Sequence, residues 1–230
     1  MRTSGMALAL VLVLAGCGHL PGARTEAAPA RPEDILDFHT LYNANCRACH
    51  GENGHGGPAM ELGNPEYQAL VDDATLRKWI SGGMPGTQMP AFAQSSGGTL
   101  TDAQINAIIA GMRKEWTKPN AFGGATPPPY AQDQPGDPKR GQQIYQQRCA
   151  SCHEMPSRQQ VANPTYLSLV SDQVLRTIII AGRTDIGQPD WRLQGVKGAS
   201  PLSTQDVTDI VTYLGSLRNP SAVSAAPMGR

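Results

Sequence analysis

Apolar side chains recur with a helical period in two segments of the chain. The first segment has apolar residues at Ile105, Ile108, Ile109 and Met112. The second has them at Val207, Ile210, Val211 and Leu214. Both follow the spacing i, i+3, i+4, i+7, which puts the apolar side chains on one face of an α-helix. The pattern predicts two amphipathic helices, each with one buried face.

Polar residues that commonly start helices precede these and other segments. Thr101-Asp102-Ala103-Gln104 has the form of a capping box, and Ser203 to Asp206 opens the later helix in a similar way. Asp137-Pro138 suits an N-cap followed by the first helical residue. Further N-caps are expected at Asp72 and Ser171.

The helical segments belong to an internal repeat. Asn64-Pro65-Glu66-Tyr67 returns 99 residues later as Asn163-Pro164-Thr165-Tyr166, and Leu76-Arg77 returns as Leu175-Arg176. Such self-similarity indicates two copies of one structural unit. The Pro-rich segment between them, residues 119–136, favours extended polyproline II structure and predicts a semi-rigid spacer.

The N-terminus has the features of an export signal. Arg2 is followed by an uncharged apolar run over residues 6–15, which is too short to span a bilayer. The run ends in Leu14-Ala15-Gly16-Cys17, which resembles the lipobox of bacterial lipoproteins. The resemblance implies cleavage after residue 16 and lipidation of Cys17, with residues 17–34 as a flexible leash. The alternative is an ordinary signal peptide, with Cys17 an incidental thiol.

Composition restricts the function and suggests a cofactor. Lys and Arg number 19, as do Asp and Glu, so the chain lacks the strong positive charge of proteins that bind nucleic acid non-specifically. Hydrophobic residues make up 40% and aromatic residues 5%, which is little material for two small cores. Another group is therefore expected inside them.

Four further cysteines supply the chemistry. They lie in two C-x-x-C-H motifs, formed by Cys46, Cys49 and His50 and by Cys149, Cys152 and His153. Two thiols on one helical turn face the same way and can bond one porphyrin, with the histidine as proximal iron ligand. Zinc binding or two disulfides are the alternatives, but the pairs are about 100 residues apart, against roughly 15–20 in zinc ribbons. The motifs therefore predict two covalently bound haem c groups.

The repeat and its motifs resemble the class I cytochrome c family, in tandem. The resemblance implies an all-α fold with domains over residues 35–118 and 137–219 and a tail over 220–230. In the first copy, Met89-Pro90-Ala91-Phe92 is similar to the family segment that supplies the sixth iron ligand, with Met84 as a rival. The resemblance also implies that the Pro58 carbonyl accepts a hydrogen bond from the ring of His50.

The second copy departs from this pattern at one position. Gln188 stands where Met89 would recur. Three possibilities stay open for the second iron: Gln188 as a ligand through its amide oxygen, an open or water-filled position, or another residue such as Lys197. A thioether ligand favours ferrous iron, so the first haem is expected to have the higher potential.

The sequence predicts a di-haem electron carrier, lipid-anchored to a bacterial membrane and facing the periplasm or cell exterior. Its expected partners are redox proteins such as a respiratory complex, with the membrane as a further contact and no nucleic acid. No catalytic residues are expected. The alternative is a peroxidase-like enzyme or gas-binding sensor that uses an open second iron.

Overall fold

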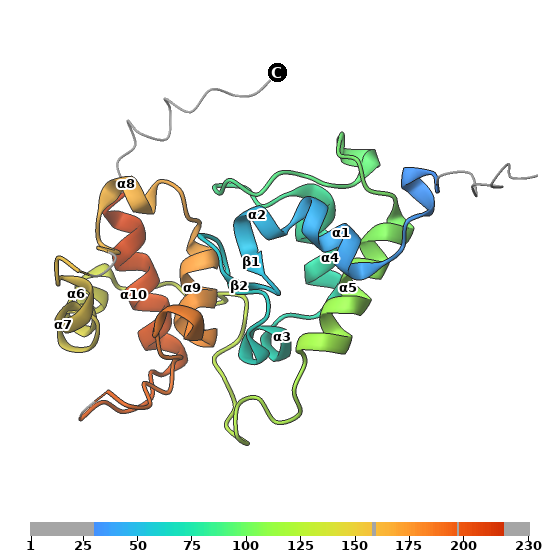
Figure 1. Ribbon diagram of the computed structural model, residues 1–230. Coiled ribbons are helices and arrows are strands. Elements are labelled where there is room, and N and C mark those ends of the chain that lie inside the picture. The colour runs from blue at the N-terminus through green and yellow to red at the C-terminus, as the bar shows by residue number, and fades with distance from the viewer. Residues whose placement is uncertain (1–29, 158–159, 197, 219–230) are drawn as a thin grey trace, which may run out of the picture. The chain divides into compact units, whose positions relative to one another are not determined.

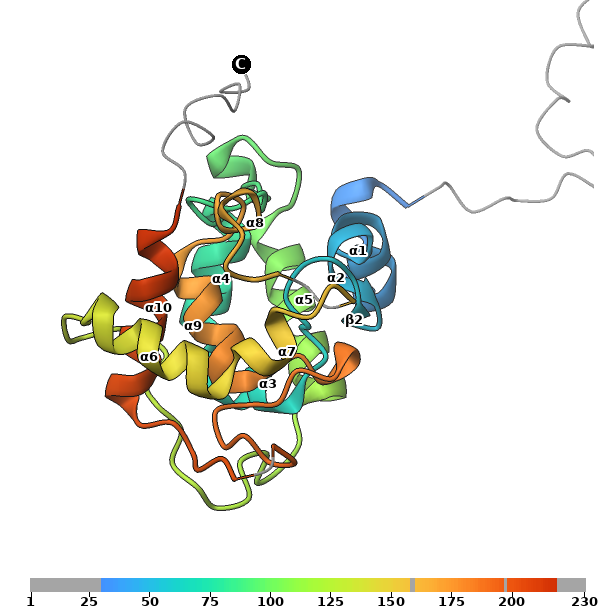
Figure 2. The same cartoon turned by 90° about the vertical axis from the view of Figure 1, so that its left-hand side faces the viewer.

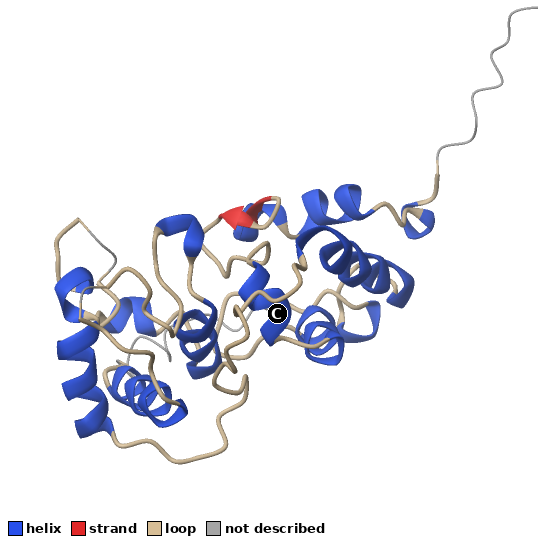
Figure 3. Cartoon of the chain, turned by 90° about the horizontal axis from the view of Figure 1, so that it is seen from below, coloured by secondary structure: helices blue, strands red, loops and turns tan. Residues whose placement is uncertain are grey.

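The computed structural model describes residues 30–157, 160–196 and 198–218. Residues 33–230 form one compact unit, apart from residues 1–32. Helices dominate the described residues, and the named strands there make only one short hairpin (Figure 3). The predicted all-α class is therefore confirmed.

The first copy of the repeat is built from five α-helices, two 3-10 turns and the hairpin (Figure 1). These are η1 (Pro32–Asp34), α1 (Phe38–Asn45), α2 (Arg47–His50), β1 (Gly51–Glu52), β2 (His55–Gly56), α3 (Pro65–Leu70), α4 (Asp73–Gly82), η2 (Gln94–Ser96) and α5 (Asp102–Trp116). The hairpin is antiparallel and pairs Gly51 with Gly56.

The second copy repeats the helical order without a counterpart to the hairpin in its described part. Its elements are α6 (Pro138–Arg148), α7 (Ala150–His153), α8 (Pro164–Leu167), α9 (Asp172–Ala181), η3 (Thr184–Ile186) and α10 (Thr204–Ser216). Figure 2 shows α6 crossing α10, the first and last long helices of this copy.

The apolar faces predicted for the last helix of each copy are confirmed. All four apolar positions of α5 are buried in one hydrophobic cluster, and all four of α10 are buried in a second. The two clusters touch, because Leu70 packs against both and Ala181 of α9 belongs to the first. The two copies therefore share apolar packing.

The predicted helix starts are confirmed as well. Complete capping boxes begin α5 and α10, and the predicted side chains accept backbone N–H groups at the other starts. The sequence analysis missed the N-cap roles of Asn64 and Asn163, which start α3 and α8 immediately before a proline. An Asn-Pro pair satisfies a free backbone donor and presets the first helical φ, which explains the repeated tetrad.

The segment between the copies is hydrogen-bonded to both of them. The Tyr130 hydroxyl accepts a hydrogen bond from Trp79 Nε1 of the first copy at 2.8 Å. Its carbonyl accepts one from Gln173 of the second copy at 2.8 Å, and the Pro129 carbonyl accepts one from Arg176 at 2.9 Å. Donors on α4 and α9 thus bind this segment to both copies.

Several predictions fall on residues outside the described ranges. These are the signal peptide, Cys17 and most of the leash, Lys197 and the whole tail over residues 220–230. Within the described ranges, no helix is both long and apolar enough to cross a membrane.

The crossing of α6 and α10 allows a test of the packing. A Cβ added at Gly141 would lie 2.0 Å from the backbone oxygen of Asp209, which cannot move without shifting α10. We expect Gly141→Ala to lower the free energy of unfolding by about 1–3 kcal/mol, the usual cost of overpacking. Urea unfolding followed by circular dichroism measures this. Gly82→Ala is the matched control, because a Cβ there meets nothing within 4 Å. Equal effects of the two changes would contradict the packing argument.

Candidate functional site

The first CxxCH motif forms a single helical turn at the end of α1. The His50 N–H donates to the Cys46 carbonyl at 2.9 Å, so the two thiols and the imidazole project from one turn. Both thiols are free. Burial, with Cys49 nearby, raises the pKa of the Cys46 thiol to about 12.

The ring of His50 is fixed by a backbone carbonyl. Its Nδ1 lies 2.8 Å from the Met60 oxygen, and since a carbonyl only accepts, Nδ1 carries the proton and Nε2 is left as the coordinating atom. The prediction that the Pro58 carbonyl accepts this hydrogen bond from His50 is therefore wrong. The Ala59 N–H donates to the Cys49 carbonyl at 2.9 Å, which turns the loop so that the next carbonyl along the chain faces the ring. Burial lowers the pKa of His50, which favours the neutral imidazole that binds metal.

The second motif has the same turn and a more direct contact. The His153 N–H donates to the Cys149 carbonyl at 3.0 Å, and both thiols of this motif are free. Burial and the neighbouring Cys152 raise the pKa of Cys149 to about 11. Nε2 of His153 lies 3.0 Å from Oε1 of Gln188. The fold thus brings the predicted proximal ligand and the candidate sixth ligand face to face, 35 residues apart in sequence.

The loops that carry Met89 and Gln188 have the same construction. We call residues 83–92 the first ligand loop and residues 182–191 the second ligand loop. The Met84 N–H donates to the Met89 carbonyl at 3.1 Å, and the Arg183 N–H donates to the Gln188 carbonyl at 3.0 Å. The two positions are therefore structurally equivalent, as the repeat predicted.

A glycine starts each ligand loop with a positive φ, +72° at Gly83 and +79° at Gly182. A Cβ on either would press against the backbone of the same loop, within 2.9 Å of the Met89 or the Gln188 oxygen. Both loops therefore need glycine at this position for the strand-like pairing that follows.

Met89 is better placed than its rival for a role in the interior. Its side chain packs against the first hydrophobic cluster, and its N–H donates to Thr87 Oγ1 at 3.1 Å. Met84 is not among the side chains packed against that cluster. The packing favours Met89 over Met84 as the sixth ligand of the first site.

Two known families match the chain. Residues 33–110 match the family described as "Cytochrome C oxidase, cbb3-type, subunit III", and residues 138–218 match the family described as "Cytochrome c". Each match contains one CxxCH turn and one ligand loop. The chain is a tandem class I cytochrome c.

Individual relatives agree with this family. The cytochrome bc1 complex cytochrome c subunit of Corynebacterium diphtheriae is 28% identical over 180 residues, covering 68% of this chain and 60% of the relative. The cbb3-type cytochrome c oxidase subunit CcoP of Azospirillum brasilense is 40% identical over 76 residues, covering 30% of this chain and 24% of the relative. The chain thus spans less than two thirds of either relative.

One solved structure is also similar to part of the chain. It is that of dihydro-heme d1 dehydrogenase NirN in complex with DHE, which shares 30% identity over 44% of this chain and 20% of that chain. Its TM-score of 0.30 is too low for the likeness to carry an argument.

Cytochrome c domains bind haem c, and the second domain has donors that fit it. Three buried polar atoms have no hydrogen-bond partner within the described part of the chain: the Tyr145 hydroxyl, Trp191 Nε1 and Arg176 Nη2. Tyr145 lies one turn before Cys149, and Trp191 lies in the second ligand loop. A buried donor without a hydrogen-bond partner costs folding free energy. Donors beside the CxxCH turn and beside the second ligand loop therefore suit a bound group that carries carboxylates, as haem does.

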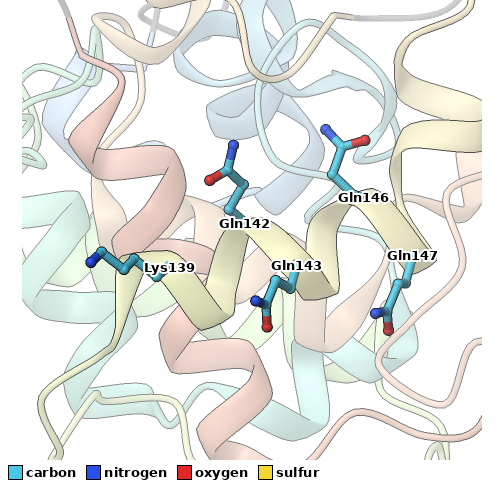
Figure 4. A pocket seen from close by; sticks show the side chains of 5 residues that line it. All are labelled: Lys139, Gln142, Gln143, Gln146 and Gln147. Carbon is cyan, nitrogen blue, oxygen red and sulfur yellow. The ribbon is translucent and has the colours of Figure 1, made fainter.

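The remaining histidines of the first domain are bound to carboxylates. Nε2 of His39 lies 3.0 Å from Glu115, and Nδ1 of His55 lies 2.8 Å from Glu61. Each of these two histidines therefore already has a carboxylate partner. A hollow over α6 is lined only by Lys139, Gln142, Gln143, Gln146 and Gln147 (Figure 4). Its lining comes from one helix and contains no cysteine, histidine or methionine, so it is not a haem site.

Charged residues between the two domains were missed by the sequence analysis. We call residues 51–64 the first histidine loop, because they follow His50 and contain Met60. Arg183 and Asp185 of the second domain bind this loop at Gly57 and Gly56, each at 2.8 Å. The signal was present in the repeat, since Arg183 and Asp185 stand where the first copy has Met84 and Gly86.

Asp185 makes the domain contact dependent on pH. Burial raises the pKa of this carboxyl, but hydrogen bonds from Arg183 and the Gly56 N–H outweigh burial and lower it to about 2. A lowered folded-state pKa stabilises the chain above the unfolded pKa, and this contribution is lost as the pH falls through the folded value. We expect the free energy of unfolding to drop between about pH 4 and pH 2, and to drop less in Asp185→Asn. Asp133→Asn, at an exposed linker position, is the control and should keep the wild-type slope. An unchanged slope in Asp185→Asn would count against this assignment.

Proposed function

We propose that this tandem cytochrome c is a membrane-tethered carrier that passes single electrons between redox proteins on the extracytoplasmic side of a bacterial membrane. The observation that carries the proposal is the pair of CxxCH turns, each joined in one compact unit to a ligand loop of common construction. Relatives named as subunits of a bc1 complex and of a cbb3-type oxidase support a respiratory role. The corresponding partners are a bc1-type donor and a terminal oxidase as acceptor.

The protein residues have defined tasks in this function. Cys46, Cys49, Cys149 and Cys152 hold two haem c groups by thioether bonds, and His50 and His153 are the proximal ligands. Haem c, when bound, supplies an iron that takes up or gives up one electron. The Met60 carbonyl keeps the imidazole of His50 in one orientation, which limits rearrangement when the charge changes.

Unequal ligation gives the transfer a direction. The Met89 thioether is soft and stabilises ferrous iron, which raises the potential of the first site. The Gln188 amide oxygen is harder, so the second site has the lower potential. Electrons then move from the second domain to the first. Gln188 lies on the second ligand loop near His153, and with Gln188 as a ligand the second iron would have no open position, which would suit a carrier rather than the enzyme or gas-sensor alternative.

A redox titration of the purified full chain tests this function. We expect two haems per chain by pyridine haemochrome assay and two separate potentials. Met89→Gln should lower the higher potential and Gln188→Met should raise the lower one, each by on the order of 0.1 V, within the range of about 0.8 V over which axial ligands act. Met84→Gln is the control and should leave both potentials unchanged. One haem per chain, or equal potentials that respond to neither variant, would overturn the proposal.

The membrane tether is tested separately at Cys17. A lipidated Cys17 would hold the chain on a membrane, since acyl chains contribute about 0.8 kcal/mol per buried CH₂. We expect Cys17→Ser to move the protein from the membrane fraction to the soluble fraction or to block its processing. Retention of a normally processed Cys17→Ser protein in the membrane would argue against the anchor.

A further inference from the structure

The second ligand loop and the end of α9 are hydrogen-bonded to the first histidine loop through both side-chain and backbone atoms. Six hydrogen bonds cross between residues 181–185 and residues 56–64. They run from Asn64 to the Ala181 carbonyl, from Arg183 to the Gly57 carbonyl, from the Gly56 N–H to Asp185, from Thr184 to both carboxylate oxygens of Glu61, and from the Asp185 N–H to Glu61. The loop that carries Gln188 is thus bound to the loop that follows His50.

Arg183 is the charged centre of this contact. Its side chain is only 8% exposed, and its guanidinium donates to both carboxylate oxygens of Asp185 at 2.8 Å. Nη2 also donates to the Gly57 carbonyl at 2.8 Å. A buried cation is tolerated when such partners satisfy it, and the planar fork of arginine suits two-point binding in a way that lysine cannot match.

The repeat separates the role of the Arg183 backbone from that of its side chain. Met84, the equivalent residue, pairs with the first ligand loop through the same N–H to carbonyl bond. The backbone bond therefore serves ligand-loop construction in both copies. The guanidinium of Arg183 has no equivalent in the first copy and instead reaches the other domain.

Hydrogen bonds of Arg183 connect the loop that holds His50 with Gln188, and both of these residues are predicted iron ligands. Nδ1 of His50 is bound to Met60, and Gly57 in the same loop accepts from the Arg183 side chain. The Arg183 backbone is bound in both directions to Gln188, at 3.0 and 2.9 Å. Arg183 is thus hydrogen-bonded to both the first histidine loop and Gln188.

We propose that Arg183 is a positioning residue for electron transfer between the two haems, because it fixes the second ligand loop against the first histidine loop. This inference rests on the proposed function. The transfer moves one electron between two irons: the donor iron is oxidised from ferrous to ferric, the acceptor iron is reduced from ferric to ferrous, and no bond forms or breaks.

The test uses the full-length di-haem protein and Arg183→Met, which installs the residue found at position 84. Flash photoreduction by a ruthenium complex loads one haem, and absorbance follows redistribution of the electron between the two. We expect the redistribution to slow several-fold, because the rate of electron tunnelling falls steeply as the distance between the two sites grows. The second haem should keep its spectrum, because the backbone bonds between residues 183 and 188 remain.

Arg192→Met is the matched control. Arg192 also joins the two domains, with Nη2 lying 3.2 Å from Glu66, but it does not bind the first histidine loop. General loosening of the domains would slow both variants alike, whereas the proposal expects Arg192→Met to stay within about twofold of wild type. Arg183→Lys, which can still donate to Gly57, should recover part of the rate.

Hydrogen exchange supplies a readout that does not depend on electron transfer. The Gly56 N–H donates to Asp185 at 2.8 Å, so its exchange should accelerate in Arg183→Met and not in Arg192→Met. A wild-type inter-haem rate and unchanged exchange in Arg183→Met would overturn the inference, as would equal slowing in both variants. Failure of the proposed function would be distinct, because it would appear in the wild-type protein as missing haems or as no electron transfer between them.

Discussion

The crossing of the first and last helices in each domain is the constraint on which both haem sites depend. Each CxxCH turn directly follows the first helix, so the direction of that helix sets where the thiols and imidazole point. A glycine permits the close approach in both domains, Gly111 against the ring of Phe38 and Gly141 against the backbone of α10. The glycine lies on the last helix in the first domain and on the first helix in the second domain.

The opposite wall of each site is a loop with little regular structure, and its shape comes from backbone pairing. A left-handed glycine and one hydrogen bond across the loop place residue 89 or residue 188 in the same setting. Because the backbone holds the position, the side chain there can change without rebuilding the fold. One scaffold can therefore present a thioether in one domain and an amide in the other, and so support unequal potentials.

The division between a backbone that shapes the loop and side chains that can vary also explains how the two domains are joined. The second ligand loop keeps its internal bonds while Arg183 and Asp185 turn outward to the first histidine loop. Buried charges are stable there because each has several partners, and Glu61, only 1% exposed, accepts bonds from both domains. The linker adds to the junction through Tyr130, which is bound to helices of both copies. Electron transfer between two sites benefits from such a fixed junction, because its rate depends on how the sites are placed.

The sequence by itself determined the helical class, the two copies, the starts of α4, α5, α6, α9 and α10, the buried faces of α5 and α10 and the equivalence of Met89 and Gln188. These follow from periodicity, capping and spacing, which act between residues near one another in the chain. Only the tertiary structure decided that Met60 rather than Pro58 holds His50, that Gln188 faces His153 and that Arg183 binds Gly57. Such contacts depend on how a loop turns and on which donors the fold brings near, and local preferences do not encode the meeting of residues 35 or 126 positions apart.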